Sequence, residues 1–387
     1  MTQPRLPPGA PGAGRWTFNL MPKGSISMPT SIEDVLDTHL MQKDVSEGYI
    51  SIRHHPEFPE LCIANYTNRA TYANHWDEAT INCRGLIYDE STGEIIARPY
   101  RKFFNLSTDT ELPDGPVMFL EKLDGYLGVS YQRPDGKWAL SSRGSFDSEM
   151  ANRANQILAK TGLDVGKHDG YTDMFEILYP ERPLVVDYGP HERLVYTGSI
   201  ERETGKWRFF DDYEDSAQLY KFDSVQQMLE TPQSSNMEGY VLAWPREHQT
   251  LIKVKFDEYL AMSRAIQGNS AKRIIQALSS GQADQLHESV EKLPPAVRRI
   301  VEKSISDIQT QFDTDYRELR AQIDPILAHV ATLPDRAAIG TYVSKNYSKD
   351  TAGAVFTALK DESQLKEYVW KRLTLPETVP VDEDDEG

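Results

Sequence analysis

A lysine followed closely by an aspartate and a glycine stands in the segment Glu121-Lys122-Leu123-Asp124-Gly125. Such a turn exposes an amine where a ligand can approach the backbone closely. A lysine becomes a nucleophile when burial or neighbouring cations lower its pKa. The spacing alone is a weak signal, because an ordinary hairpin with an exposed lysine produces it as well. The surrounding residues therefore have to decide between the two interpretations.

Two further lysines are predicted to share one face of a strand. Residues 251–256 alternate strictly, so their apolar side chains are expected to face a core and Lys253 and Lys255 the opposite side. Two ammonium groups on one face repel each other unless an anion lies between them, and a triphosphate would serve. A half-buried strand with a solvated lysine face is the alternative.

Two glutamates stand beside or within apolar strand patterns. Glu238 precedes Gly239 at the start of one such strand, where a carboxylate could hold Mg²⁺ directly or through water. Glu176 lies inside residues 174–177, and its burial would need a partner such as a ribose hydroxyl or a metal-bound water. The alternatives are a turn carboxylate for Glu238 and an outward-facing side chain for Glu176.

Two cationic segments precede the Lys122 turn. Arg84 and Gly85 open a predicted strand, and residues 98–106 place three cations beside Phe103 and Phe104. Arginine suits bidentate contact with phosphate oxygens, and an aromatic ring can stack on a base. Core packing is the alternative for the two phenylalanines, and at least one of them is expected in the core.

Short strands are the elements expected to position these residues. They are separated by turn signals such as Ser91-Thr92-Gly93 and are predicted at residues 84–88, 94–98, 126–131, 138–142, 173–178, 240–244 and 251–256. A helix is predicted at residues 147–160. Thr30 with Glu33 is typical of a capping box and predicts another helix, which continues to about Lys43.

The pattern changes after about Arg264, where strand signals give way to helical periodicity. Helices are predicted at residues 271–278, 296–311, 316–323, 352–359 and 363–373. The predicted fold class is α+β, with a domain of antiparallel sheets followed by an all-helical domain. The expected boundaries are 1–29 for a flexible extension, 30–262 for the sheet domain, 263–376 for the helical domain and 377–387 for an acidic tail.

Charge and composition restrict the possible functions. The net charge of −17 over 387 residues argues against a protein that coats nucleic acid, although an enzyme that engages only strand ends needs few phosphate contacts. The sequence contains no run of about eighteen apolar residues, the length that would predict a membrane helix. The first thirty residues lack the apolar core of a signal peptide. With only Cys62 and Cys83, a reducing cytoplasm is the expected compartment.

Taken in order, these segments resemble the nucleotidyltransferase motifs of covalent ligases and RNA-capping enzymes, and most closely the bacteriophage-type RNA ligase 1 family. The resemblance runs from about Asn65 to Tyr259 and also includes Asn65-Tyr66 and residues 202–205. The motifs that carry it are Cys83-Arg84-Gly85, Arg98-Pro99, Lys102-Phe103-Phe104-Asn105-Leu106, Lys122-Leu123-Asp124-Gly125, Ser142-Arg143-Gly144-Ser145, Phe175-Glu176, Glu238-Gly239-Tyr240-Val241 and Lys253-Val254-Lys255.

The resemblance implies a role for each matched residue. Lys122 would attack the α-phosphate of ATP and carry the AMP, with Lys253 and Lys255 as catalytic partners. Glu238 would hold Mg²⁺, or alternatively Mn²⁺, through water. Contacts that bind or shape the nucleotide site are implied for Arg84, Lys102, Phe104, Asp124, Gly125, Arg143, Glu176, Gly239 and Tyr259. Arg143 departs from the lysine that the family usually has at its position, so its role is the least defined.

The expected function is therefore that of an ATP-dependent RNA ligase. It would join 5′-phosphate and 3′-hydroxyl ends of RNA, such as a cleaved tRNA, and act as a monomer away from membranes beside a polynucleotide kinase–phosphatase. A DNA ligase or capping enzyme is a rival, but those usually carry a β-barrel after the lysine pair. A tRNA ligase that requires a 2′-phosphate and a non-catalytic nucleotide- or RNA-binding module are further alternatives.

Overall fold

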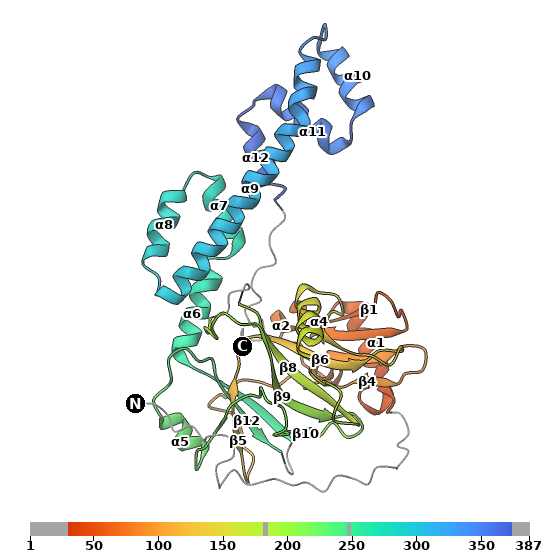
Figure 1. The fold of residues 1–387 in the computed structure, drawn as a ribbon, viewed down its shortest axis with the longest axis vertical. Helices are drawn as coiled ribbons and strands as arrows, with labels where there is room; N and C mark the ends of the chain where they lie inside the picture. Colours follow the sequence, from red (N-terminus) through yellow and green to blue (C-terminus); the bar gives the residue numbers. More distant parts are fainter. Residues whose placement is uncertain (1–29, 181–184, 246–248, 374–387) are drawn as a thin grey trace. The chain divides into compact units, whose positions relative to one another are not determined.

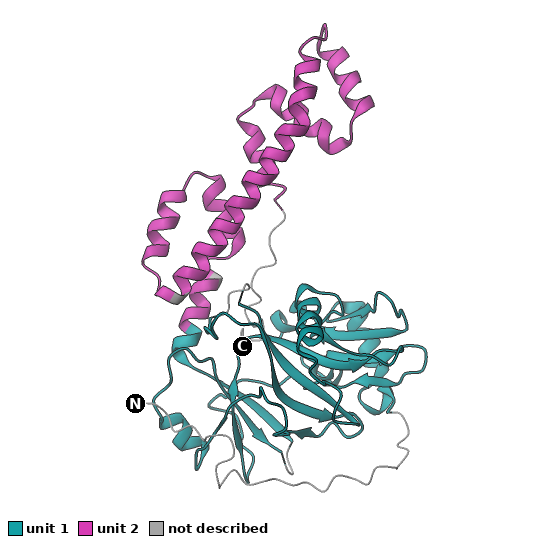
Figure 2. Ribbon diagram, viewed as in Figure 1, with its two compact units in different colours: residues 1–260, 382–387 teal, residues 261–381 magenta. Residues whose placement is uncertain are grey.

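The computed structural model describes residues 30–180, 185–245 and 249–373. This part of the chain forms two compact units, of which the first ends at Leu260 and the second begins at Ala261 (Figure 2). The extension predicted over residues 1–29 and the acidic tail predicted over residues 377–387 lie outside the described residues.

Three antiparallel sheets form the first unit (Figure 1). The first has the order β1-β2-β3-β4, with strands Ile50–His54, Leu61–Tyr66, Arg84–Asp89 and Ile95–Ala97. The second has the order β10-β9-β8-β6-β7, with strands Trp207–Arg208, Arg193–Glu201, Tyr171–Leu178, Tyr126–Gln132 and Trp138–Ser142. The third has the order β11-β5-β12-β13, with strands Leu219–Tyr220, Met118–Lys122, Gly239–Trp244 and Thr250–Lys255. Together with the helical region that follows, these sheets confirm the predicted α+β class.

The packing of these sheets follows from their apolar residues. Ile63, Ile87, Val129 and Tyr131 are buried in one cluster that joins the first sheet to the second. The helix α4 (Glu149–Thr161) contacts β7 and contributes Ile157 to another cluster on the second sheet. Apolar clusters thus cover both faces of the second sheet at β6 and β8. Polar residues are therefore expected at the ends of the strands.

The N-terminal helix differs from its prediction. The capping box is formed by Ser31 and Asp34, not by Thr30 and Glu33, and it opens only the 3₁₀ turn η1 (Ile32–Asp34). The Asp37 carboxylate accepts hydrogen bonds from the backbone N–H groups of His39 and Leu40. It therefore caps the start of a separate helix, α1 (Thr38–Glu47). A second cap within a few residues divides what the sequence pattern presents as one helix.

All seven strands predicted from the sequence are present, with small changes of boundary, while β1, β2, β5, β9, β10 and β11 were not among them. The strand β13 also differs in its burial. Lys253 is buried and Val254 is partly exposed, so both faces of the strand are covered and the alternation does not separate a core face from a solvated one. The remaining short helices of this unit are α2 (Asn68–Tyr72), α3 (Glu78–Asn82) and α5 (Val225–Glu230).

The second unit is helical and is organised along the 36-residue helix α9 (Pro295–Val330) (Figure 1). The helices predicted at residues 296–311 and 316–323 are one element, because Phe312 continues the buried stripe and stacks on Trp370 at 4.0 Å. The helices α6 (Asp257–Gly268), α8 (Ala283–Glu291) and α10 (Arg336–Asn346) were not predicted. The unit contains α6 in part (Asp257–Gly268), and then α7 (Ala271–Ser279), α8 (Ala283–Glu291), α10 (Arg336–Asn346), α11 (Lys349–Lys360) and α12 (Gln364–Trp370).

Candidate active site

Three neighbouring strands bring Lys122 and Lys255 to opposite sides of a glycine. The register pairs Gly239 of β12 with Lys122 of β5 on one side and with Lys255 of β13 on the other. Gly239 has a φ of 152°, and a Cβ placed on it would lie 1.9 Å from the carbonyl oxygen of Val254. Only glycine fits this position. The space between the two lysines is therefore free of any side chain from the central strand.

The carboxylate of Glu238 joins these two lysines. Its Oε1 lies 2.6 Å from Nζ of Lys122 and 2.9 Å from Nζ of Lys255. The Glu238 and Lys255 side chains are 1% and 2% exposed, and the Lys122 side chain is 12% exposed. The two ammonium groups approach Oε1 as ion pairs and not along hydrogen-bonding directions. One buried carboxylate between two ammonium groups leaves an excess of positive charge, which suits an anionic ligand.

Asp124 fixes the turn that follows Lys122. Its carboxylate accepts hydrogen bonds from the Tyr259 hydroxyl at 3.0 Å and from the Val186 backbone N–H at 2.9 Å. Its own backbone N–H donates to the Tyr188 hydroxyl at 2.7 Å. Burial, and then the nearby charge of Glu238, raise the pKa of Asp124 to about 7. The turn is thus held by three hydrogen bonds, two of them accepted by a carboxyl group that titrates near neutral pH.

Gly125 lets the strand β8 approach this turn. A Cβ on Gly125 would lie 2.6 Å from Cγ of Glu176 and 2.9 Å from the carbonyl oxygen of Ile177. Glu176 is partly buried and faces the turn rather than open solvent. The close approach brings this carboxylate, on a neighbouring sheet, beside the segment that carries Lys122.

The segment after Arg101 runs along the free edge of β13. The Leu106 N–H donates to the Lys253 carbonyl oxygen at 2.7 Å, and the Lys253 N–H donates to the Phe104 carbonyl oxygen at 2.9 Å. The ring of Phe103 then lies 5.4 Å from the Lys253 ammonium and 5.7 Å from the Arg84 guanidinium carbon. Phe103 packs against the core of the second and third sheets, whereas Phe104 is 46% exposed. One of the two phenylalanines is in the core, as predicted.

Arg84 has donors without partners. Its Nε and Nη1 atoms are buried, and among the described residues they make no hydrogen bond. Buried donors of this kind are rare in folded proteins, and a bound anion would satisfy them. Gly85 beside it has a φ of 89°, and a Cβ there would lie 2.9 Å from the carbonyl oxygen of Arg143. The Arg143 loop therefore closes against the start of β3.

Aromatic rings surround the ammonium group of Lys102. Nζ lies 4.4 Å from the centroid of Trp76, 5.2 Å from that of Tyr66 and 5.6 Å from that of Phe104. Arg143 reaches the same cluster, because its Nη1 donates to the Tyr66 hydroxyl at 2.9 Å. Sequence reasoning noted Tyr66 only within the family resemblance and missed Trp76. The signal for both is their rings' contact with a lysine far along the chain, which no local pattern reveals.

The thirteen predicted site residues all lie in the first unit and form three linked groups. Lys122, Glu238, Gly239 and Lys255 meet across the third sheet, with Asp124, Gly125, Glu176 and Tyr259 at the adjoining turn. Lys253 connects this group, through the Phe103 ring, to Arg84. Lys102, Phe104 and Arg143 form the third group around Tyr66. The chain thus collects six cations around one network of carboxylates and rings.

Residues 82–260 match the family described as RNA ligase. This segment belongs to the RNA ligase family. All the strands and turns that carry Lys122, Glu238 and Lys255 lie within the matched residues. The resemblance to RNA ligases that the motifs indicated is therefore confirmed for the part of the chain that holds the candidate site.

The chain matches individual relatives over only part of its length. It is 24% identical over 271 residues to a protein of Autographa californica nuclear polyhedrosis virus described as "Putative bifunctional polynucleotide kinase/RNA ligase", with 61% of this chain and 38% of that protein covered. It is 27% identical over 122 residues to "RNA ligase 1" of Bacteriophage TS2126, with 27% and 31% covered. An archaeal ATP-dependent RNA ligase structure aligns with a TM-score of 0.45 at 14% identity, over 71% of this chain and 77% of that one.

The chain thus spans 38% and 31% of the length of these two sequence relatives. Among the helices that the structure describes, none has both the length and the apolar composition needed to cross a membrane.

Proposed function

We propose that this chain is an ATP-dependent RNA ligase that joins 5′-phosphate and 3′-hydroxyl ends through a lysyl-AMP intermediate on Lys122. The observation that supports this most strongly is the convergence of the Lys122 and Lys255 ammonium groups on one buried oxygen of Glu238, within the RNA ligase segment. Because the chain spans less than half of the sequence relatives named above, the activity of the whole protein is part of the proposal.

In the first step the neutral Lys122 amine attacks the α-phosphorus of ATP. A phosphorus–nitrogen bond forms, the bond to the pyrophosphate oxygen breaks, and the proton that the amine loses passes to the departing pyrophosphate. Lys253 and Lys255 would stabilise the negative charge that builds on the α-phosphate, because positioned cations act strongly in a buried site. The ion pair between Lys255 and Glu238 already holds one of these cations in place before ATP binds.

Two displacements at phosphorus follow. A 5′-phosphate oxygen of the RNA attacks the AMP phosphorus and releases Lys122, which leaves an RNA–adenylate. The 3′-hydroxyl oxygen of the second end then attacks the 5′-phosphate, and AMP departs as the ends are joined. The unpartnered Nε and Nη1 donors of Arg84 fit a phosphate oxygen in these steps. Lys102 and Arg143 would contact phosphates near the exposed Phe104 ring.

The carboxylates of the site fit a divalent cation. Oxygen ligands suit Mg²⁺, with Mn²⁺ as the alternative, and such an ion would neutralise the pyrophosphate leaving group. Both lysines already contact Oε1 of Glu238, so we expect this carboxylate to hold the ion through water. Glu176 would bind the ribose, and Tyr259 would hold Asp124 so that the Lys122 turn keeps its shape.

The biological substrate is proposed to be broken RNA, with cleaved tRNA as the leading candidate. A polynucleotide kinase–phosphatase would supply the 5′-phosphate, and the name of the viral relative joins a polynucleotide kinase to an RNA ligase. The helical residues 263–376 would select among RNA substrates. We further propose that the protein acts as a monomer in the cytoplasm.

The test is a pair of assays on the full chain. Incubation with ATP or GTP labelled at the α-phosphate should give a covalent adduct with ATP alone. A sealing assay should then join RNA ends that carry a 5′-phosphate and a 3′-hydroxyl. An adduct with GTP alone would indicate a capping enzyme, and the absence of any adduct would indicate a binding module. Sealing of DNA alone would indicate a DNA ligase. A strict need for a 2′-phosphate would indicate a different tRNA ligase.

A further inference from the structure

A second cluster of charged groups lies outside the site described above. His75, in the loop after α2, places its Nε2 3.1 Å from Oδ1 of Asp44 and 3.2 Å from Oδ2 of Asp77. Asp44 is in the last turn of α1, and Asp77 is the N-cap of α3. The helices α1 and α3 therefore direct two carboxylates at one ring nitrogen, which the loop between α2 and α3 supplies.

The negative charge of this cluster is not balanced by the residues around it. Asp44 is fully buried, and its Oδ2 has no hydrogen-bond partner among the described residues. A carboxylate is also unfavourable in the last turn of a helix, where the negative end of the helix dipole lies. Even a protonated His75 carries one positive charge against two carboxylates.

The geometry of the cluster is fixed by a second set of contacts. The Thr80 backbone N–H and hydroxyl both donate to Oδ1 of Asp77 at 2.9 Å, which leaves Oδ2 directed at His75. The Tyr49 ring stacks on the His75 ring with centroids 4.0 Å apart. Outer contacts that orient ligands in this way are a regular feature of protein metal sites.

We propose that Asp44, His75 and Asp77 form a binding site for a divalent transition-metal ion, and that Zn²⁺ fits it best. Three protein ligands of nitrogen and oxygen type with one position left for water are common for Zn²⁺. Ligands about 2.0–2.1 Å from a shared ion in a tetrahedral arrangement lie about 3.3–3.4 Å from one another. The 3.1 and 3.2 Å separations at His75 Nε2 are close to this spacing. The imidazole ligand favours Zn²⁺ over Mg²⁺.

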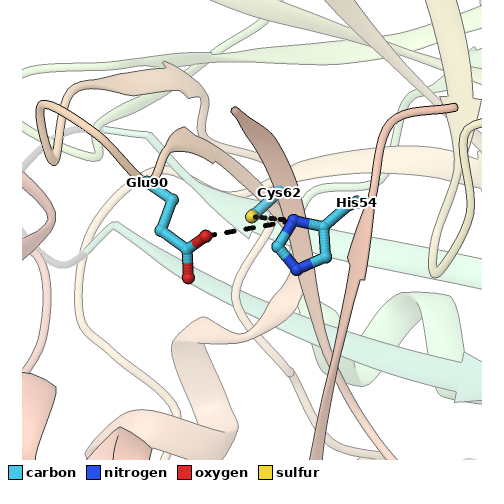
Figure 3. A group of neighbouring side chains, drawn as sticks. All are labelled: His54, Cys62 and Glu90. Carbon is cyan, nitrogen blue, oxygen red and sulfur yellow. Dashed lines mark hydrogen bonds and ion pairs between the residues drawn. The ribbon is translucent and has the colours of Figure 1, made fainter. Parts of the chain in front are cut away.

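A second group of potential ligands provides a contrast (Figure 3). His54 Nδ1 lies 3.3 Å from Sγ of Cys62 and 3.9 Å from Oε2 of Glu90. The same nitrogen lies 3.0 Å from the carbonyl oxygen of Pro59, an acceptor that favours a hydrogen rather than a metal ion on this nitrogen. The His54 and Glu90 side chains are also more than half exposed, so water can solvate them. We assign no ion to this group, and it serves as a matched control.

The proposed metal site has a consequence for the RNA ligase site. Trp76 lies between His75 and Asp77 in the chain, and its ring covers the Lys102 ammonium at 4.4 Å. An ion held by the two flanking residues would restrain the backbone on both sides of Trp76. Trp76 would then act as a positioning residue for Lys102. This consequence rests on the proposed function, whereas the metal assignment does not.

The test is calorimetric titration of the metal-stripped full chain with ZnSO₄ in buffer that contains excess MgCl₂ but no ATP, with bound zinc measured after dialysis. The wild type and the control His54→Ala should each bind one equivalent of Zn²⁺. Asp44→Asn and Asp77→Asn should weaken binding by at least about tenfold. The intrinsic fluorescence should also change on Zn²⁺ addition, and this change should be lost in Trp76→Phe.

Each outcome decides the assignment. Absence of Zn²⁺ binding in the wild type would overturn it, as would unchanged binding in both aspartate variants or loss of binding in His54→Ala. If circular dichroism shows that one aspartate variant does not fold, Zn²⁺ binding by the other variant decides. Asp77→Asn is expected to fold, since an asparagine at position 77 can keep the contacts with Thr80. Adenylation is measured separately with Mg²⁺ and ATP, so failure of the metal assignment and failure of the ligase proposal remain distinguishable.

Discussion

The two units of the chain treat charged side chains in opposite ways. The first unit buries ionisable groups, among them Lys102, Asp124, Glu238 and Lys253. In the second unit, the buried polar residues of the described chain are hydroxyl side chains, and its charged residues form exposed pairs along helices, such as Lys303 with Asp307. Burying a charge is costly, and a protein that keeps several has a use for them. We therefore propose that chemistry belongs to the first unit and that the second contributes through the shape of its surface.

The substitution with the largest expected effect is Lys122→Ala. It should abolish the AMP adduct, because no other amine occupies the end of β5, while Lys255 still neutralises Glu238 and the fold persists. The measurement is labelling with α-³²P-ATP alongside circular dichroism. The exposed Lys221, changed to alanine, is the control and should label normally. A labelled Lys122→Ala protein would place the nucleophile elsewhere.

The two lysines of β13 should each matter for adenylation. Changing Lys253 or Lys255 to methionine should slow adduct formation by about 10²–10³-fold, the usual effect of removing a group that stabilises transition-state charge. Methionine preserves most of the buried volume. The matched substitution in the helical unit, Lys303→Met, should leave the rate unchanged. Equal rates for all three variants in single-turnover experiments would remove the distinction drawn between the units.

Asp124 predicts a pH dependence of stability. Because its folded-state pKa is raised to about 7, Asp124 stays protonated in the folded chain while the unfolded chain ionises near pH 4. The free energy of unfolding that protonated Asp124 contributes is fully present below about pH 4 and is lost as pH rises to about 7. The loss is on the order of 4 kcal/mol. Asp124→Asn should remove this loss. Urea unfolding at pH 4.5, 6 and 8 compares the two proteins, and parallel curves would contradict the assignment.

Removing the helical unit should separate adenylation from RNA selection. A chain that ends at Gly268 should form the AMP adduct at a rate close to that of the full chain, since every candidate site residue precedes Leu260. It should lose its preference among RNA substrates with different structures around the break. A folded truncation that cannot react with ATP would show that the helical region takes part in the chemistry.

The smallest expected effect concerns an exposed pair of the helical unit. Lys303→Ala removes the contact with Asp307, four residues later in α9. Exposed pairs at this spacing contribute only about 0.3–0.5 kcal/mol. Urea unfolding should detect at most this change, and neither adduct formation nor sealing should respond. A large loss of sealing would instead assign Lys303 to the RNA contact surface.

The sequence singled out residues that the fold brings together, but it predicted the elements around them less completely. Lys122, Glu238 and Lys255 could be identified because each stands in a short motif, but their mutual contacts depend on the register of three strands far apart in the chain. Trp76 could not be identified, because its contact with Lys102 has no local signature. Local alternation also misjudged β13, since burial of its lysine face depends on the segment that runs along it.

In the helical unit the sequence pattern predicted the correct type of structure but divided α9 into two helices. The polar residues around Phe312 interrupt the apolar period, and the stacking on Trp370 that continues the buried stripe is a tertiary contact. Helical periodicity therefore located the elements approximately and carried no information about what they bind.

The glycine between Lys122 and Lys255 restricts how this protein can be engineered. A mutant library intended to enlarge the nucleotide site gains nothing at Gly239, because the side chain is already absent and the backbone oxygen of Val254 sets the limit. Gly125, against Glu176 and Ile177, is limited in the same way. Variation for altered nucleotide choice is better directed to the ring cluster of Tyr66, Trp76 and Phe104, where the exposed Phe104 can change size without moving a strand.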